Sequence, residues 1–268
     1  MSTLANSATV VRASAIVGFE DLRAIYTWRT WTLGWLLRVV VQVTFFALLG
    51  RYIGQTDRVE FLVVGAAASV ATLEALSVVM FASADRWAGL LPLIVASPGD
   101  YHLVLLSRNV NCVATGTVTS GIALLISQWV VPTGFEFGPL LLCLPLLALG
   151  ALSTYCFGGF LCAIVTKVTN GRWLVLNASY MTLSVVGGFL VPLDFWPEPV
   201  QWFAEVLPFS HALQAMRGVL HGASAGFVLG RCAAEVLVML GWLVVGRLAL
   251  SASVAMGRRD GSIELSGG

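Results

Sequence analysis

The sequence predicts an all-α polytopic membrane protein with about six transmembrane helices. Of its 268 residues, 58% are hydrophobic and 11% are charged, whereas a soluble domain carries roughly 25% charged residues. The mean hydropathy is +0.88, so a water-soluble fold would leave a large apolar surface uncovered. The net charge of +1 gives no basis for nucleic-acid binding. We therefore interpret residues 1–268 as a single transmembrane domain.

About six stretches are apolar enough to cross a bilayer, which takes about 20 residues. They are residues 31–49, 59–82, 103–131, 139–165, 173–191 and 229–250. Residues 1–9 are small and polar and suggest a frayed tail. Residues 10–30 mix apolar and charged side chains at helical spacing, which predicts an amphipathic helix on the membrane surface. A plain cytoplasmic helix is the alternative.

Lysine and arginine in the short connections predict the orientation, because they accumulate on the cytoplasmic side. The larger set is Arg12, Arg23, Arg29, Arg86, Arg108, Lys167, Arg172, Arg258 and Arg259. The smaller set, which would lie outside, is Arg51, Arg58, Arg217 and Arg231. Both termini, including a tail at residues 257–268, are therefore expected in the cytoplasm.

Residues 84–99 form a short amphipathic stretch between the second and third spans. Its polar start at Asp85 and Arg86 and its exit at Pro98 and Gly99 predict a surface helix that ends in a turn. A stiff helix joined directly to two spans can turn movement of a partner protein into tilting of those spans. A passive interfacial loop is the alternative.

Residues 192–222 are rich in apolar side chains but interrupted by prolines. They are too few for two further spans, and they suit a re-entrant helical hairpin that enters the outer leaflet. Such a hairpin can form a lid over an exit path or a packed structural cap. Its candidate gate residues are Gly188, Pro192, Pro197, Pro208 and Arg217.

Among the charged residues inside the predicted spans, Arg38 lies in the first span and Glu74 in the second. Arg38 and Glu74 lie at matched depth, roughly 10 Å from the inner surface at 1.5 Å per residue, which makes them a candidate ion pair. They can line a gate at the inner mouth, act as a structural clamp, or leave Arg38 reaching alone toward the headgroups. Arg231 and Glu235 are four apart and are expected to pair locally.

No catalytic, cofactor-binding or metal-ligating set is expected on this chain. The only lysine, Lys167, lies outside any Gly-Lys-Ser/Thr run of the kind that cradles nucleotide phosphates. His211 and His221 have no carboxylate at a metal-ligand spacing, and no role is assigned to them.

Two motifs and the six-span plan resemble the membrane subunits of type 2 ABC exporters, which include daunorubicin-type drug exporters and polysaccharide exporters. After the second span, that family has an acidic-basic start, then Gly-Thr-Leu-Glu-Leu-Leu and a proline. The matching positions here are Arg86, Gly89, Leu90, Leu91, Pro92, Leu93, Ile94 and Pro98, with Leu90 and Pro92 in place of the family's threonine and glutamate. The family's outer Gly-x-x-x-Pro…Pro…Pro…Arg pattern matches Gly188 to Arg217.

The resemblance implies a permease that docks residues 84–99 on a separate ABC ATPase, which would bind ATP and Mg. It also implies a second permease, identical or a sibling, in a bacterial-type plasma membrane. The few charges favour an amphipathic drug-like or lipid-like cargo, as in multidrug efflux. A polysaccharide or glycolipid exporter is the alternative within transport. An intramembrane enzyme or a non-transporting scaffold is the alternative from another class.

Overall fold

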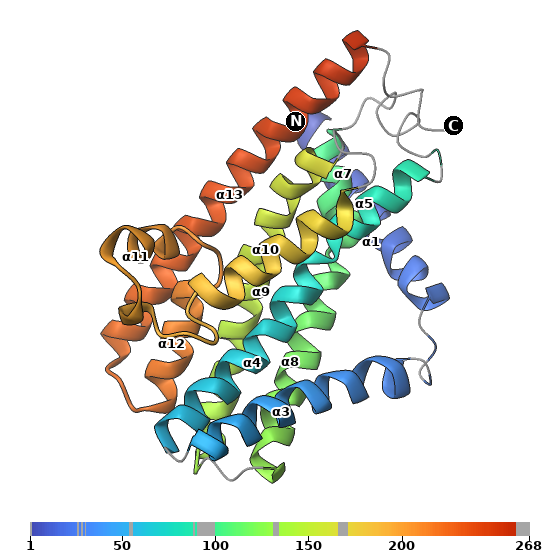
Figure 1. The fold of residues 1–268 in the computed structure, drawn as a ribbon. Coiled ribbons are helices and arrows are strands. Elements are labelled where there is room, and N and C mark those ends of the chain that lie inside the picture. The colour runs from blue at the N-terminus through green and yellow to red at the C-terminus, as the bar shows by residue number, and fades with distance from the viewer. Residues whose placement is uncertain are drawn as a thin grey trace.

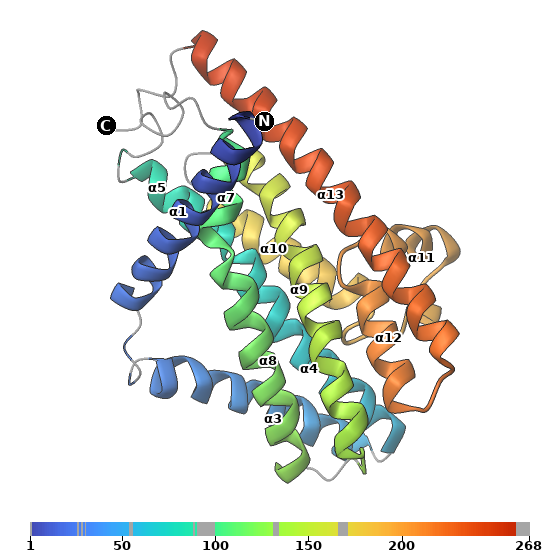
Figure 2. The same ribbon diagram turned by 180° about the vertical axis from the view of Figure 1, so that it is seen from behind.

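The computed structural model describes residues 2–25, 27, 29, 31–53, 56–87, 89, 100–130, 134–165 and 171–260. Within these residues the chain is all-helical and has no β-strand, as its composition predicts (Figures 1 and 2). The elements are α1 (Ser2–Ile25), η1 (Trp31–Leu36), α3 (Leu37–Ile53), α4 (Thr56–Leu76), α5 (Val78–Trp87), α7 (Tyr101–Asn109), α8 (Asn111–Val130), α9 (Phe137–Val165), α10 (Arg172–Val186), η2 (Leu193–Phe195), α11 (Glu198–Glu205), α12 (Ser210–Leu220) and α13 (Ala225–Asp260).

Among the described residues, 5 helical stretches are long and apolar enough to cross a membrane. They are Thr32–Tyr52, Arg58–Asp85, Tyr101–Trp129, Phe137–Val165 and Ala225–Met256. The span expected at residues 173–191 is α10, a helix of only 15 residues. At 1.5 Å per residue α10 is about 22 Å long, shorter than the hydrocarbon core of about 30 Å. The predicted count of six spans is therefore not confirmed.

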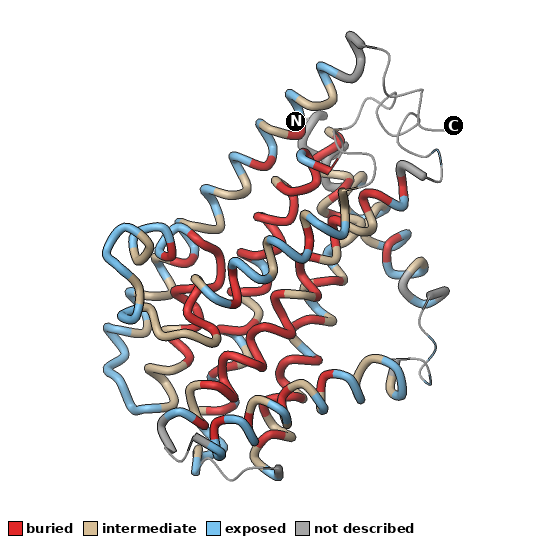
Figure 3. The backbone as a smooth tube through the Cα atoms, in the orientation of Figure 1, coloured by how far each residue is buried: buried red, intermediate tan, exposed pale blue. Residues whose placement is uncertain are grey.

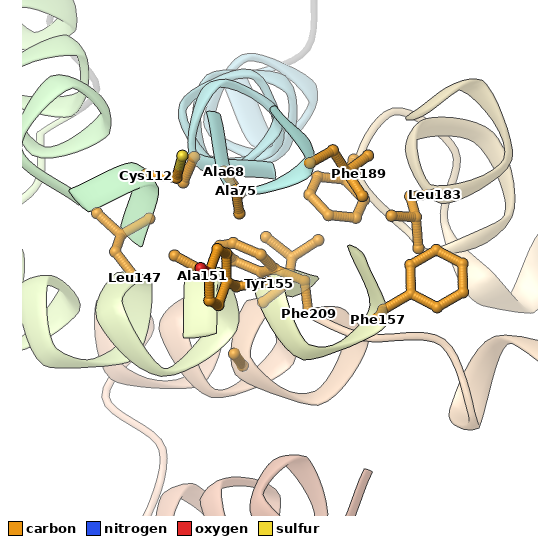
Figure 4. Close-up of a cluster of buried hydrophobic side chains, with 14 of the residues drawn as sticks. Ala68, Ala75, Cys112, Leu147, Ala151, Tyr155, Phe157, Leu183, Phe189 and Phe209 are labelled. Carbon is orange, nitrogen blue, oxygen red and sulfur yellow. The ribbon is translucent and has the colours of Figure 1, made fainter. Parts of the chain in front are cut away.

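Helix α9 lies at the centre of the bundle. It contacts α4, α5, α8, α12 and α13, and Figure 3 shows that α4 and α9 are the most continuously buried helices. The rings of Phe189 and Phe209, with centroids 5.4 Å apart, pack beside α4 and α9 (Figure 4). These large side chains fill the core between the two central helices.

The outer helices expose apolar side chains. In an apolar 18-residue stretch of the span formed by α4 and α5, 83% of the residues are buried. In the corresponding stretches of the spans that contain α3 and α13, only 22% and 6% are buried. Exposed apolar surface of this kind suits contact with lipid or with another membrane helix.

The N-terminal segment differs from its prediction at both ends. Helix α1 begins at Ser2, where a frayed tail is predicted, and ends at Ile25, short of residue 30. It packs against α7, and Figure 2 shows it on the outside of the bundle, near the end where α13 finishes.

The second and third spans each contain a break. The second bends at Ser77, and α5 then continues to Trp87. Asp85 and Arg86 therefore end this span instead of beginning a separate surface helix. The third divides at Val110 into α7 and α8.

Candidate functional site

Arg108 on α7 joins three helices beside the segment of residues 84–99. Its Nη1 donates to Asp85 Oδ1 of α5 at 2.9 Å. Its Nε and Nη2 donate to Asp21 Oδ2 of α1 at 3.1 and 2.7 Å. The Arg108 and Asp85 side chains are largely buried, whereas Asp21 is half-exposed. Because the guanidinium donors lie in one rigid plane, Arg108 holds α1, α5 and α7 in a fixed arrangement.

Asp100 anchors the other end of this segment. Its Oδ1 accepts from the backbone N–H of His102 at 3.1 Å and so caps the start of α7. Its Oδ2 pairs with Arg247 Nη2 of α13 at 2.8 Å. Residues 84–99 are thus tied near their start to α1 and α7 by the contacts of Arg108. Directly after their end, Asp100 ties them to α13.

The predicted docking residues are only partly described. Arg86 lies near the end of α5. Gly89 is exposed, and its φ of +69° lies in the left-handed region that favours glycine, as suits a residue that ends a helix. Leu90, Leu93, Ile94 and Pro98 lie outside the described residues.

A cavity of about 810 Å³ lies among α1, α3, α4, α8 and α10, and both Arg38 and Glu74 line it. No ion pair within 4 Å joins these two described residues, so the predicted direct contact is not formed. Trp35 lies beside Arg38 and lines the same cavity as Glu74. The Arg38 Cζ lies 4.1 Å from the centroid of the Trp35 ring, a cation–π distance.

Arg217 on α12 fastens the segment that follows α10 to the bundle. Its Nη1 donates to the Gly188 carbonyl at 2.8 Å, and its Nη2 donates to the carbonyls of Phe189 and Phe61 at 3.2 and 3.3 Å. The guanidinium also lies 3.6 Å from the Phe61 ring centroid. Burial lowers the pKa of Arg217 to about 9, so the side chain stays charged at neutral pH. Two predicted gate residues, Gly188 and Arg217, are therefore in contact.

The remaining gate residues shape the backbone. Pro192 precedes η2, Pro197 caps the start of α11, and Pro208 lies in the turn between α11 and α12. Proline cannot donate the hydrogen bond that would continue a helix, so each marks an interruption. Gly188 has a φ of +85°, which lets the chain turn toward Arg217 after α10.

Glu235 on α13 is a further residue of interest. Its spacing of four residues from Arg231 predicts a pair with that arginine, but the carboxylate binds the start of α12 instead. Its Oε1 accepts from the backbone N–H of Phe209 at 2.8 Å, and its Oε2 accepts from those of His211 and Ala212 at 3.1 and 3.0 Å. The carboxylate thereby caps the start of α12. The expected local pair with Arg231 is replaced by this contact, and Arg231 Nη1 lies 3.3 Å from His211 Nδ1.

The other unassigned histidine, His221, has a partner near the N-terminal end of α4. Its Nε2 lies 3.1 Å from Glu60 Oε2, and its Nδ1 lies 2.8 Å from the Arg217 carbonyl. An ionisable residue inside a membrane-spanning helix is by default a functional candidate. That rule singles out Glu235 from sequence without identifying α12 as its partner.

The fold and these contacts define an α-helical, multi-pass membrane protein whose charged contacts tie helices together at both ends of the bundle. The family model described as ABC-2 type transporter matches residues 23–221, from the end of α1 to just past α12. The chain belongs to the ABC-2 type transporter family and is the membrane permease subunit of an ABC transporter. A search of curated proteins finds no match to the sequence.

Proposed function

We propose that this permease exports an amphipathic drug-like or lipid-like molecule and is driven by a separate ATPase that docks on residues 84–99. The contacts at the two ends of this segment carry the proposal. Asp85 at its entry pairs with Arg108, and Asp100 at its exit pairs with Arg247. A force on the segment therefore acts on α1, α7 and α13 together. ATP and Mg would bind to the ATPase.

The cavity supports an amphipathic cargo. Its lining is mostly apolar and includes the opposite charges of Arg38 and Glu74, a combination that suits a molecule with an apolar body and a polar end. A polysaccharide or glycolipid exporter would need a longer polar path. Transport of a polysaccharide instead of an amphiphile would therefore contradict this part of the proposal.

The assembly would contain a second permease, either identical or a sibling, in a bacterial-type plasma membrane. The exposed apolar faces of α3 and α13 can contact such a partner or lipid. The distribution of lysine and arginine favours cytoplasmic termini. Helix α1 and the C-terminal end of α13 lie at the same end of the bundle (Figure 1), which is consistent with this orientation. The outer segment at residues 192–222 would be a re-entrant hairpin over the exit.

A matched pair of glycines provides the test. Gly89 and Gly222 have φ values of +69° and +72°, and a Cβ built on either meets no atom of the described residues within 4 Å. Gly89 lies within the docking segment, whereas Gly222 lies between α12 and α13. Glutamate at either position introduces the same strain and charge, and acidic residues have little effect on membrane topology.

The permease is purified with the ATPase that co-purifies from its native membrane, and transport and ATP hydrolysis are measured in proteoliposomes. We expect Gly89→Glu to abolish transport that depends on ATP while the protein still inserts, and Gly222→Glu to keep most of it. Equal transport by the two variants would contradict the docking role.

A further inference from the structure

We propose that the cavity among α1, α3, α4, α8 and α10 binds the headgroup of a zwitterionic amphiphile, with an ammonium group close to a phosphate or carboxylate. The inference rests on the proposed function only in treating such a molecule as cargo. Binding itself requires the permease alone, so it can be tested without the ATPase.

Unpaired polar atoms in the cavity wall are the first reason. Ser77, Thr115 and Asn177 line the cavity, and each side chain donates to a carbonyl one turn earlier, at 3.0, 2.9 and 2.8 Å. In contrast, Glu74 Oε1 and Asn111 Nδ2 are buried without a hydrogen-bond partner among the residues that the structure describes. An unsatisfied buried polar atom is costly, and a bound headgroup can supply both an N–H donor and an oxygen acceptor.

The two opposite charges are the second reason. Arg38 is exposed and stacks on Trp35, and within the described part of the chain no carboxylate lies within 4 Å of it. Glu74 lines the same cavity. A simple cation would be attracted by Glu74 but repelled by Arg38, and a simple anion would meet the reverse. A zwitterion can place its ammonium group at Glu74 and its anionic group at Arg38 and Asn111.

The rest of the wall suits an apolar chain. It includes Phe19, Leu73, Met80, Phe81, Val118 and Leu176. The volume of about 810 Å³ falls within the range of roughly 300–1,000 Å³ that is typical of small-molecule sites. This space accommodates a headgroup and the first part of one acyl chain.

The test uses four probes with the same acyl or alkyl chain length. Lysophosphatidylethanolamine carries both charges, lysophosphatidylglycerol only the anion, an alkylamine only the cation, and a monoacylglycerol neither. Binding to the full-length permease in detergent is measured by competition with a lysophosphatidylethanolamine that is fluorescently labelled on its chain. We expect the zwitterionic probe to bind at least about tenfold more tightly than each other probe, because a hydrogen bond to a charged group is worth this much or more.

Two neutral substitutions with matched controls locate the site. We expect Glu74→Gln to weaken binding of the zwitterion and of the alkylamine by about tenfold. The anionic probe should bind at least as tightly as before, because the substitution removes its repulsion by Glu74. Arg38→Gln should weaken the binding of the zwitterion and of the anionic probe, and it should not weaken the binding of the alkylamine. The controls are Glu60→Gln, near the opposite end of α4, and Arg51→Gln, exposed on α3, which should bind all four probes as the wild type does. Thermal unfolding of every variant verifies folding.

Asn111→Ala provides an independent variant that changes no charge, and it should weaken the zwitterionic and anionic probes by several-fold. Equal binding of all four probes, or equal affinities of the Glu74→Gln and Glu60→Gln proteins, would overturn the proposal. Movement of the zwitterionic probe by the ATPase-coupled protein would identify cargo. Binding without movement would identify a resident lipid, and both outcomes uphold the site. Loss of docking at residues 84–99 with intact binding would reject only the proposed function.

Discussion

The guanidinium of Arg108 in α7 lies 2.9 Å from the carboxylate of Asp85 in α5, and residues 88–99 lie between these two helices in sequence. The same guanidinium binds Asp21 of α1. One side chain thus links the two helices that flank residues 88–99 to the N-terminal helix. We infer that this contact lets α5, α7 and α1 move as a unit.

Replacing Arg108 with glutamine should loosen this unit. The substitution leaves the largely buried Asp85 carboxylate without its partner and close to the half-exposed Asp21. We expect a loss on the order of 2 kcal/mol, below the 3–5 kcal/mol of a fully buried pair. The melting temperature should fall by several degrees, and ATP-driven transport should fall with it. Arg51→Gln, on the exposed end of α3, is the control, and equal melting temperatures for the two variants would argue against the linkage.

Arg217→Lys should release the outer segment while leaving the charge in place. A lysine ammonium cannot reproduce the planar set of contacts to Gly188, Phe189 and Phe61. We expect faster proteolysis within residues 187–209 when protease is added outside, together with a lower melting temperature. Arg51→Lys changes an exposed arginine in the same way and should behave as the wild type does. Unchanged proteolysis of Arg217→Lys would mean that other contacts hold this segment.

Glu235→Gln tests the cap on α12. The carboxylate accepts hydrogen bonds from three backbone N–H groups. In glutamine one of the two oxygens is replaced by an NH₂ group, which cannot accept, so at least one backbone N–H loses its partner. A buried donor left unsatisfied costs about 1–3 kcal/mol. We expect a matching loss of stability and faster hydrogen exchange at the start of α12. Glu205→Gln changes an exposed carboxylate on α11 and should have little effect. If both variants have wild-type exchange rates, Glu235 does not hold α12.

The sequence predicts an all-helical membrane protein because the length of each apolar stretch can be read directly along the chain. The family motif also singles out Gly188 and Arg217 as candidate gate residues, but it does not predict the hydrogen bond that joins them. The fifth span is harder to assign, because its apolar run continues beyond Val186 through residues that are not helical. Hydropathy does not detect the turn that begins at Gly187.

Contacts between helices depend on how each helix is rotated about its own axis. The depth of a residue in the membrane, which the sequence does predict, does not give this rotation. Arg38 and Glu74 are predicted at equal depth, yet in the part of the chain that the structure describes they form no ion pair, and the Arg38 guanidinium stacks on Trp35. Trp35 belongs to η1, a π-helical stretch whose side chains do not follow the usual angular spacing. Spacing also suggests that Glu235 pairs with Arg231, one turn away, whereas its carboxylate is directed toward α12.

The central claim is that residues 84–99 face the cytoplasm and bind the separate ATPase. A photo-crosslinking amino acid at Leu93 tests it, with the same amino acid at the exposed Phe195 of η2 as the control. We predict a covalent product with the co-purifying ATPase from position 93 only, formed in inside-out vesicles. Labelling of a cysteine at position 93 by a membrane-impermeant reagent from outside intact cells, with no ATPase product, would contradict the account.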